Sequence, residues 1–283
     1  MEEAEKSKDS SKKLIDIKGV IGSKNPKLLK RTPKFVVKYL QRILHETDVN
    51  DFVAQHQNAS PIEFCLAVMK KFNIEVTVSG LENIPEEKGA ILAINHPLGG
   101  MDAMALVTVL HEQRPDIKFI VNDVLMHLEN LRPIFVGINK HGVNGAAALK
   151  KVEGTFKGDD LLCIFPAGLV SRKYEGKIQD LPWKKTFVTR AKKYDKTIIP
   201  VFLDGELSRF FYNLYRFRKW FGIKANIEML YLVNELYKQH NKKINIIFGA
   251  PVAAKELNNS KTDVEWAEEI RQKVYALKEE HGR

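Results

Sequence analysis

The chain has 283 residues and a formal net charge of +10 at pH 7, from 45 Lys and Arg against 35 Asp and Glu. This length fits one large domain or two small ones, and 44% hydrophobic residues are enough for a sizeable core. The basic excess favours an anionic partner, such as lipid headgroups, nucleic acid or an acidic carrier protein. Because no nucleic-acid-binding motif is recognisable, we expect no nucleic-acid partner.

Nothing in the sequence resembles a targeting or membrane-spanning segment. The charged N-terminus lacks the apolar centre of a secretory signal, and no run reaches the ~18 apolar residues of a spanning helix. Cys65 and Cys163 lie in apolar runs, which predicts buried free thiols in a reducing compartment. We therefore expect a cytoplasmic protein, either soluble or peripheral on the inner face of the cell membrane.

The N-terminal quarter is predicted to be helical. Residues 1–13 are polar and predicted to be a disordered tail, and residues 14–73 form an N-terminal helical region. Within it, an apolar stripe after Thr32-Pro33 predicts a helix over 32–44. A capping box that begins at Ser60 predicts a second helix over 60–72.

From residue 74 onwards, short apolar strands alternate with helical stretches. The predicted strands are 74–78, 90–94, 117–121, 134–138, 161–165, 197–203 and 244–248. The predicted helices are 102–112, 123–130, 145–157, 184–194, 208–221 and 263–280. This alternation predicts one α/β domain over 74–283, with a mixed central sheet flanked by helices.

A histidine and a carboxylate flank a glycine-rich turn at a predicted strand-to-helix junction. His96 suits proton abstraction because its unperturbed pKa lies near ~6.5. Asp102 could fix the imidazole tautomer and stabilise the imidazolium. Gly99 and Gly100 would let the backbone fold back, so that the two side chains meet. The spacing alone also fits a loop histidine followed by a helix N-cap.

A second polar group follows the predicted strand 161–165. Open α/β sheets bind ligands at the carboxyl ends of their strands, where this group lies. Arg172 could clamp a phosphate or carboxylate, and turn amides around Gly168 could add donors. Ser171 could hydrogen-bond the substrate. A strand-ending turn with a solvated arginine fits this segment equally well.

Together these segments resemble the glycerolipid and lysophospholipid acyltransferase superfamily over roughly residues 75–215. Its members transfer a fatty acyl chain from a thioester to a hydroxyl. The matching blocks, in order, are Asn95-His96 with Asp102, Phe165-Pro166-Ala167-Gly168 and Ile198-Ile199-Pro200-Val201. The chain departs from the family pattern in its His-x5-Asp spacing and in Ala167, where a glutamate is usual. These variants look most like the hemolysin-like or ornithine-lipid-type O-acyltransferase branch.

The resemblance implies direct acyl transfer. His96 would take a proton from the acceptor hydroxyl as the oxygen attacks the thioester, and Asp102 would orient His96. The donor would be acyl-ACP or acyl-CoA, with no bound cofactor and no metal. The acceptor would be lysophosphatidate or a lyso-aminolipid, and the departures favour the latter. The implied substrate-binding residues are Asn95, Gly99, Gly100, Phe165, Pro166, Gly168, Ser171, Arg172 and Lys140.

The segment 209–221 is dense in aromatic and basic residues, a composition that suits the headgroup boundary of a membrane. We expect Trp220 and Phe221 to contact the membrane, although core packing of some rings is the alternative. The helix over 32–44 is a second candidate. A basic face could also dock an acidic acyl carrier protein.

Two other functions remain open. A lipid ester hydrolase could use Ser171 as its nucleophile, but the chain lacks a Gly-x-Ser-x-Gly elbow. A non-catalytic lipid-binding protein would not need both His96 and Asp102.

Overall fold

A computed structural model describes residues 13–86, 88–138 and 146–281. The described residues fall into two compact units that divide between residues 58 and 59. The expected tail therefore lies outside the described residues, apart from Lys13, and Lys140 lies outside them too. The division falls before the helix α5 (Pro61–Phe72), whereas the sequence analysis places a boundary at residue 73. The reason is that α5 packs on α6 (Gly100–Leu110), inside the second unit.

The first unit contains four short helices among its described residues. They are α1 (Ile17–Lys24), α2 (Pro26–Arg31), α3 (Lys34–Ile43) and α4 (Glu46–Gln55). The helix expected over 32–44 is α3, which begins after Pro33 and buries Val37 and Ile43.

The second unit is built on a seven-stranded sheet within the described ranges, with the order β1-β9-β8-β2-β5-β3-β4. Its strands are β1 (Glu75–Ser79), β2 (Ala90–Ile94), β3 (Lys118–Asn122), β4 (Phe135–Ile138), β5 (Leu161–Ile164), β8 (Thr197–Leu203) and β9 (Lys243–Phe248). All pairs are parallel except β8 with β9, so the sheet is mixed, as predicted. A parallel sheet buried on both faces explains why β2 and β5 are continuously apolar.

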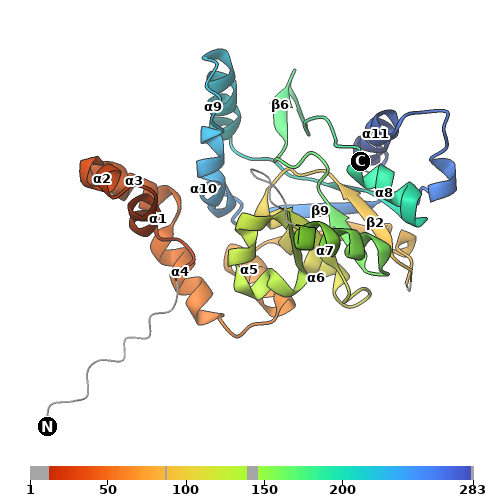
Figure 1. The fold of residues 1–283 in the computed structure, drawn as a ribbon, viewed down its shortest axis with the longest axis horizontal. Coiled ribbons are helices and arrows are strands. Elements are labelled where there is room, and N and C mark those ends of the chain that lie inside the picture. The colour runs from red at the N-terminus through yellow and green to blue at the C-terminus, as the bar shows by residue number, and fades with distance from the viewer. Residues whose placement is uncertain (1–12, 87, 139–145, 282–283) are drawn as a thin grey trace, which may run out of the picture. The chain divides into compact units, whose positions relative to one another are not determined.

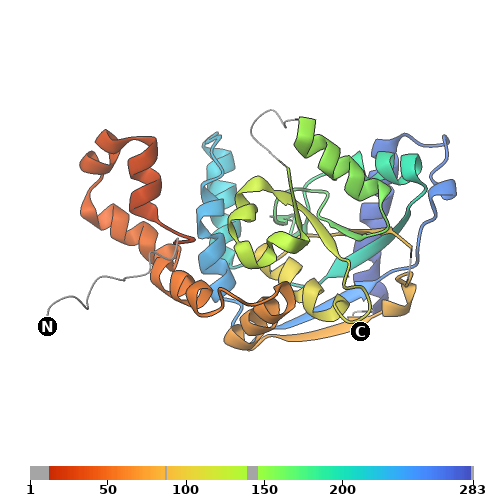
Figure 2. The same ribbon diagram turned by 60° about the horizontal axis from the view of Figure 1, so that its bottom comes forward.

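Helices cover both faces of the sheet (Figure 2). One face carries α5 and α6. The other carries α7 (Ala146–Lys157), α8 (Thr186–Tyr194) and α11 (Asp263–His281). Alternate residues of β2 face opposite layers, and Ile91 and Ala93 join the core under α7, α8 and α11. The predicted α/β fold class is confirmed.

The capping box predicted at Ser60 is present, because Ser60 and Glu63 exchange hydrogen bonds at the start of α5. Thr262 and Glu265 form a second capping box at the start of α11. The helix expected over 123–130 is wrong in type, because this stretch forms the 3₁₀ helices η2 (Asp123–His127) and η3 (Glu129–Ile134). Pro133 lies inside η3 and lacks the N–H that a regular α-helix would use.

Figure 1 shows a β-hairpin and a helix that project from the second unit. The sequence analysis predicts the helix but not the hairpin. The hairpin, β6 (Arg172–Tyr174) and β7 (Lys177–Gln179), is absent from the predicted elements. It packs beside α9 (Arg209–Trp220), the helix expected over 208–221, which begins at the N-cap Ser208. Below α9 lie η4 (Ile227–Tyr231) and α10 (Leu232–Tyr237). No helix in the described ranges is both long and apolar enough to cross a bilayer.

Candidate active site

His96 and Asp102 form a hydrogen-bonded pair at the junction of β2 and α6. Nδ1 of His96 lies 2.8 Å from Oδ2 of Asp102. The imidazole is 19% exposed, whereas the carboxylate is fully buried. With Nδ1 directed at a carboxylate, Nε2 is the ring nitrogen left to accept a proton from a substrate. The pair has the geometry of a general base and its orienting acid.

The turn that joins the pair is fixed by backbone amides. Leu98 and Gly99 donate their N–H groups to the Asp102 carboxylate at 3.0–3.1 Å. Gly99 adopts φ +75°, a conformation that favours glycine, and this lets the chain reverse within five intervening residues. Because the Gly99 N–H is used by Asp102, it is not a donor for an oxyanion. Burial raises the pKa of Asp102, and the hydrogen bond with His96 opposes that shift.

Asn95 connects two strand ends. Its Nδ2 donates to the Leu203 carbonyl at 2.8 Å, and its Oδ1 accepts from the Leu203 N–H at 2.7 Å. The residue is 2% exposed. Asn95 therefore joins the end of β2 to the end of β8, next to His96. Its side-chain amide satisfies both backbone polar groups of Leu203.

The Phe-Pro-Ala-Gly turn lies against the histidine. The rings of His96 and Phe165 stack with centroids 4.2 Å apart. Gly168 adopts φ +66°, and its N–H donates to the Phe165 carbonyl at 2.9 Å. The Pro166 carbonyl accepts from Lys184 N–H at 3.2 Å. The structure thus brings the first two sequence blocks into contact, because both follow parallel strands that end at one edge of the sheet.

Asp180 is a buried carboxylate that the sequence analysis missed. Its Oδ1 accepts from the His96 N–H at 3.2 Å and from the Ser171 hydroxyl at 2.6 Å. Its Oδ2 accepts from Trp183 Nε1 at 2.9 Å. Burial raises the pKa of Asp180, and the bonds from Ser171 and Trp183 oppose that shift. The only sequence signal for it is an acid in an Asp-Leu-Pro-Trp loop.

Ser171 serves the loop and is not arranged as a nucleophile. Its hydroxyl donates to Asp180, its N–H donates to the His96 carbonyl at 2.8 Å, and the residue is 1% exposed. A serine nucleophile would need its hydroxyl on a base such as His96. The Ser171 geometry therefore weighs against the hydrolase alternative.

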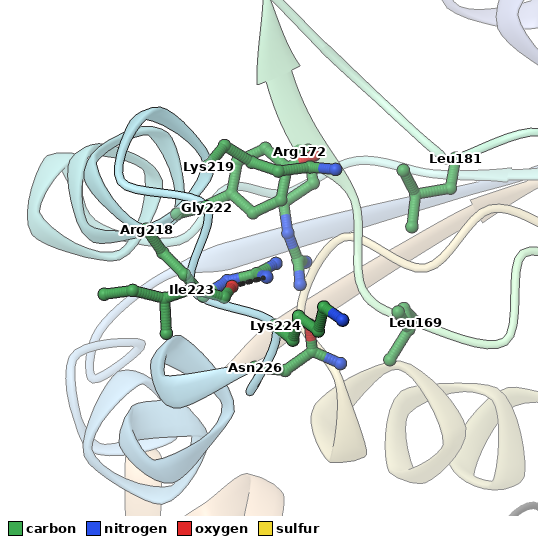
Figure 3. Close-up of a pocket in the computed structure, with 10 residues that line it drawn as sticks. Leu169, Arg172, Leu181, Arg218, Lys219, Gly222, Ile223, Lys224 and Asn226 are labelled. Carbon is green, nitrogen blue, oxygen red and sulfur yellow. Dashed lines mark hydrogen bonds between the residues drawn. The ribbon is translucent and has the colours of Figure 1, made fainter.

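Arg172 is fully buried and paired with an acid from η4. Its Nη2 lies 3.0 Å from Oε1 of Glu228, which is also fully buried. Arg218 of α9 binds the same carboxylate at 2.8 and 3.1 Å. The Arg172 guanidinium also lies over the Tyr215 ring, with 4.8 Å to its centroid. The expected solvated or substrate-clamping arginine is thus held inside an Arg–Glu–Arg cluster. Figure 3 shows the two arginines of this cluster among the residues that line a pocket.

Two cavities are lined by neighbours of His96. One, of about 410 Å³, has mainly apolar walls from β3, β4, α7 and β5, and includes Phe165, Pro166 and Gly168. The other, of about 810 Å³, is bounded by Asn95, Ser171, five lysines and three acids. The lysines are Lys173, Lys177, Lys242, Lys243 and Lys278, and the acids are Asp204, Glu206 and Glu279. Candidate substrate-binding residues therefore line both cavities.

Neither cysteine is placed for chemistry. Cys65 and Cys163 are both buried free thiols, as predicted. Burial raises the pKa of Cys65 to about 12 and raises that of Cys163 as well, so neither forms a nucleophilic thiolate near neutral pH. Among the described residues, no group of three His, Cys, Asp or Glu side chains is arranged to hold a metal ion.

Comparisons with known proteins show the family of this chain. A family model described as Acyltransferase matches residues 19–282. Lyso-glycine lipid O-acyltransferases from Bacteroides thetaiotaomicron and Phocaeicola vulgatus are 41% and 39% identical over 270 residues. These alignments cover 95% of this chain and 99% and 97% of the relatives.

The fold also has a solved counterpart. The crystal structure of the 1-acyl-sn-glycerophosphate (LPA) acyltransferase PlsC from Thermotoga maritima matches with a TM-score of 0.52 and 17% identity. The match covers 94% of both chains. At this identity it shows a shared fold, and the family match and the curated relatives show the activity class. The chain belongs to the acyltransferase family and is an enzyme that transfers acyl groups.

Proposed function

We propose that this enzyme transfers a fatty acyl chain from an acyl thioester to the hydroxyl of a lyso-glycine lipid. The observation that carries the proposal is the His96–Asp102 pair, joined at 2.8 Å at the strand edge where α/β enzymes bind substrates. The acceptor class comes from two relatives of about 40% identity over nearly their whole length. A lyso-glycine lipid is a lyso-aminolipid, the acceptor class that the two sequence departures favour.

In this mechanism, Nε2 of His96 takes the proton of the acceptor hydroxyl. The hydroxyl oxygen attacks the thioester carbonyl, the carbon–sulfur bond breaks, and the thiol leaves with a proton returned by the imidazolium. Asp102 holds the ring through Nδ1 and stabilises its positive charge. Asp180 holds the backbone N–H of His96 and adds a second buried carboxylate nearby. No covalent acyl-enzyme is required.

The donor chain fits the apolar cavity beside Phe165. Its walls include Ile120, Val152 and Phe156, and burial of methylenes there stabilises an acyl chain by about 0.8 kcal/mol each. Because Phe165 stacks on His96, a thioester at the cavity mouth would lie close to the base. The second cavity has five lysines against three acids in its lining, and this net positive charge suits the phosphates or acidic surface of the donor carrier, either acyl-ACP or acyl-CoA.

The enzyme is proposed to act as a peripheral protein on the inner face of the cell membrane. Trp220 is 82% exposed and Phe221 is 55% exposed at the end of α9. Arg216 and Lys219 are exposed on the same helix. Aromatic rings with flanking cations suit insertion at an anionic lipid boundary. Two free cysteines fit the reducing side of that membrane.

The acceptor assignment is tested by an acyl-transfer assay with lyso-glycine lipid and lysophosphatidate as acceptors. Acyl-CoA and acyl-ACP are each supplied as the donor in separate assays. We expect kcat/KM for lyso-glycine lipid to exceed that for lysophosphatidate by at least about tenfold, because the site discriminates between headgroups. Preferred acylation of lysophosphatidate would overturn the acceptor. Hydrolysis of a lipid ester without transfer would support the hydrolase instead.

Replacing the base should abolish most of the transfer rate. We expect His96→Ala to lower kcat by about 10²–10⁴-fold, the range typical of a general base, and Asp102→Asn to lower it as well. The matched control is His111→Ala, which removes another half-buried histidine at the end of α6. Wild-type kcat in His96→Ala would exclude the proposed role.

Narrowing the apolar cavity should change donor preference. Ala148 of α7 lines the cavity, and we expect Ala148→Phe to lower the ratio of long-chain to short-chain kcat/KM by about tenfold. Ala147→Phe is the matched control, because the neighbouring residue is exposed and does not line the cavity. Equal donor profiles for the two variants would place the acyl chain elsewhere.

Removing the exposed rings should weaken membrane binding. In sedimentation with anionic vesicles, we expect Trp220→Ala/Phe221→Ala to lower the partition coefficient on the order of tenfold or more. A double variant at the exposed apolar residues Leu66 and Val264 is the control. If both double variants bind as the wild type does, the end of α9 is not the membrane contact.

A further inference from the structure

A pocket of about 500 Å³ lies between the end of α9 and the segment that follows β5. Its cationic lining residues are Arg172, Arg218, Lys219 and Lys224. Figure 3 shows the two guanidinium groups close together, with Leu169 and Leu181 on the other side of the pocket from α9. The pocket therefore combines a strongly basic wall with an apolar one.

The positive charge of this pocket is only partly compensated. The buried carboxylate of Glu228 pairs with both arginines and neutralises one of the two charges. Lys219 and Lys224 are exposed, and within the described ranges neither pairs with an acid. A net charge of this sign in a half-enclosed space favours an anionic ligand.

A second observation points to a missing partner. Arg172 is fully buried, and its Nε has no hydrogen-bond partner among the described residues. An orphaned buried donor is costly, and functional sites are where such groups persist.

The end of α9 does not oppose an anion. Backbone N–H groups of Phe221, Gly222 and Ile223 donate to the last carbonyls of the helix at 3.0–3.2 Å. The Ile223 carbonyl accepts from Arg218 Nη1 at 3.0 Å. These carbonyl oxygens are therefore satisfied, and the side-chain cations dominate the field in the pocket.

We propose that this pocket binds the free carboxylate of the acceptor lipid, with Lys219 and Lys224 as its direct charge partners. The inference rests on the proposed function, because a glycine joined to an acyl chain through its nitrogen keeps a free carboxylate. Arg172 directly follows Ser171, whose N–H donates to the His96 carbonyl at 2.8 Å. A headgroup anchored here lies beside the catalytic loop, and Leu169 and Leu181 contact its apolar portion. Glu228 is a positioning residue that fixes both arginines.

The test measures binding without turnover. Lyso-glycine lipid in neutral detergent micelles is titrated calorimetrically into the full-length protein without an acyl donor, alongside the methyl ester of the same lipid. We expect Lys219→Ala/Lys224→Ala to raise Kd for the acid by at least about tenfold and to leave Kd for the ester unchanged. Both lysines are exposed, so folding should not suffer, and Lys255→Ala/Lys273→Ala is the charge-matched control.

Three outcomes overturn the proposal. The first is an unchanged Kd for the acid, and the second is an equal rise in Kd for the acid and for the ester. The third is that the double lysine variant binds more weakly only to anionic vesicles in the sedimentation assay, which would assign the lysines to the bilayer. The failure of the proposed function looks different. In that case, the wild type would bind the acid through these lysines and yet transfer no acyl group to it, and the pocket assignment would stand.

Discussion

The loops around His96 are held together by one buried carboxylate, that of Asp180. It accepts hydrogen bonds from the His96 N–H, the Ser171 hydroxyl and Trp183 Nε1. These donors come from three separate segments, after β2, after β5 and before α8. A buried carboxylate is costly unless it is hydrogen-bonded, so this arrangement stabilises the folded loops only when all three segments are in place. The position of His96 is thereby coupled to that of Ser171, which precedes the pocket-lining Arg172.

The acidic groups beside His96 are buried, whereas the lysines at the end of α9 are exposed. The two carboxylates that accept hydrogen bonds from His96, Asp102 and Asp180, are both buried. The cations Lys219 and Lys224 lie at the surface, at the end of α9. Buried negative charge stabilises a protonated imidazole, whereas exposed positive charge attracts an anionic lipid without the cost of desolvation. The chain thus combines buried carboxylates beside His96 with exposed cations at the end of α9, although the two groups lie far apart in the sequence.

The Arg172–Glu228–Arg218 cluster links α9 to the turn that follows β5. A buried ion pair of this kind contributes little net stability, because desolvation offsets most of the Coulomb gain. Its consequence here is geometric. Arg172 follows the strand β5 turn, Arg218 belongs to α9, and Glu228 belongs to η4, so the shared carboxylate fixes α9 relative to the turn. The helix that exposes Trp220 is in this way oriented by the same residues that bound the pocket.

The sequence by itself determined the sheet, most of its helices and the His96–Asp102 pair, because these depend on local signals. Apolar runs specify buried strands, capping boxes mark helix starts, and glycine at position 99 permits the positive φ that the turn needs. Only the tertiary structure decided that Arg172 is paired and buried, that Ser171 and the His96 N–H donate to Asp180, and that Lys219 lines a pocket with Arg172. Those relations join residues from different strands and helices, and such contacts leave no periodicity in the sequence. Charge and spacing identify a side chain's chemistry, but its partner is set by how the elements pack.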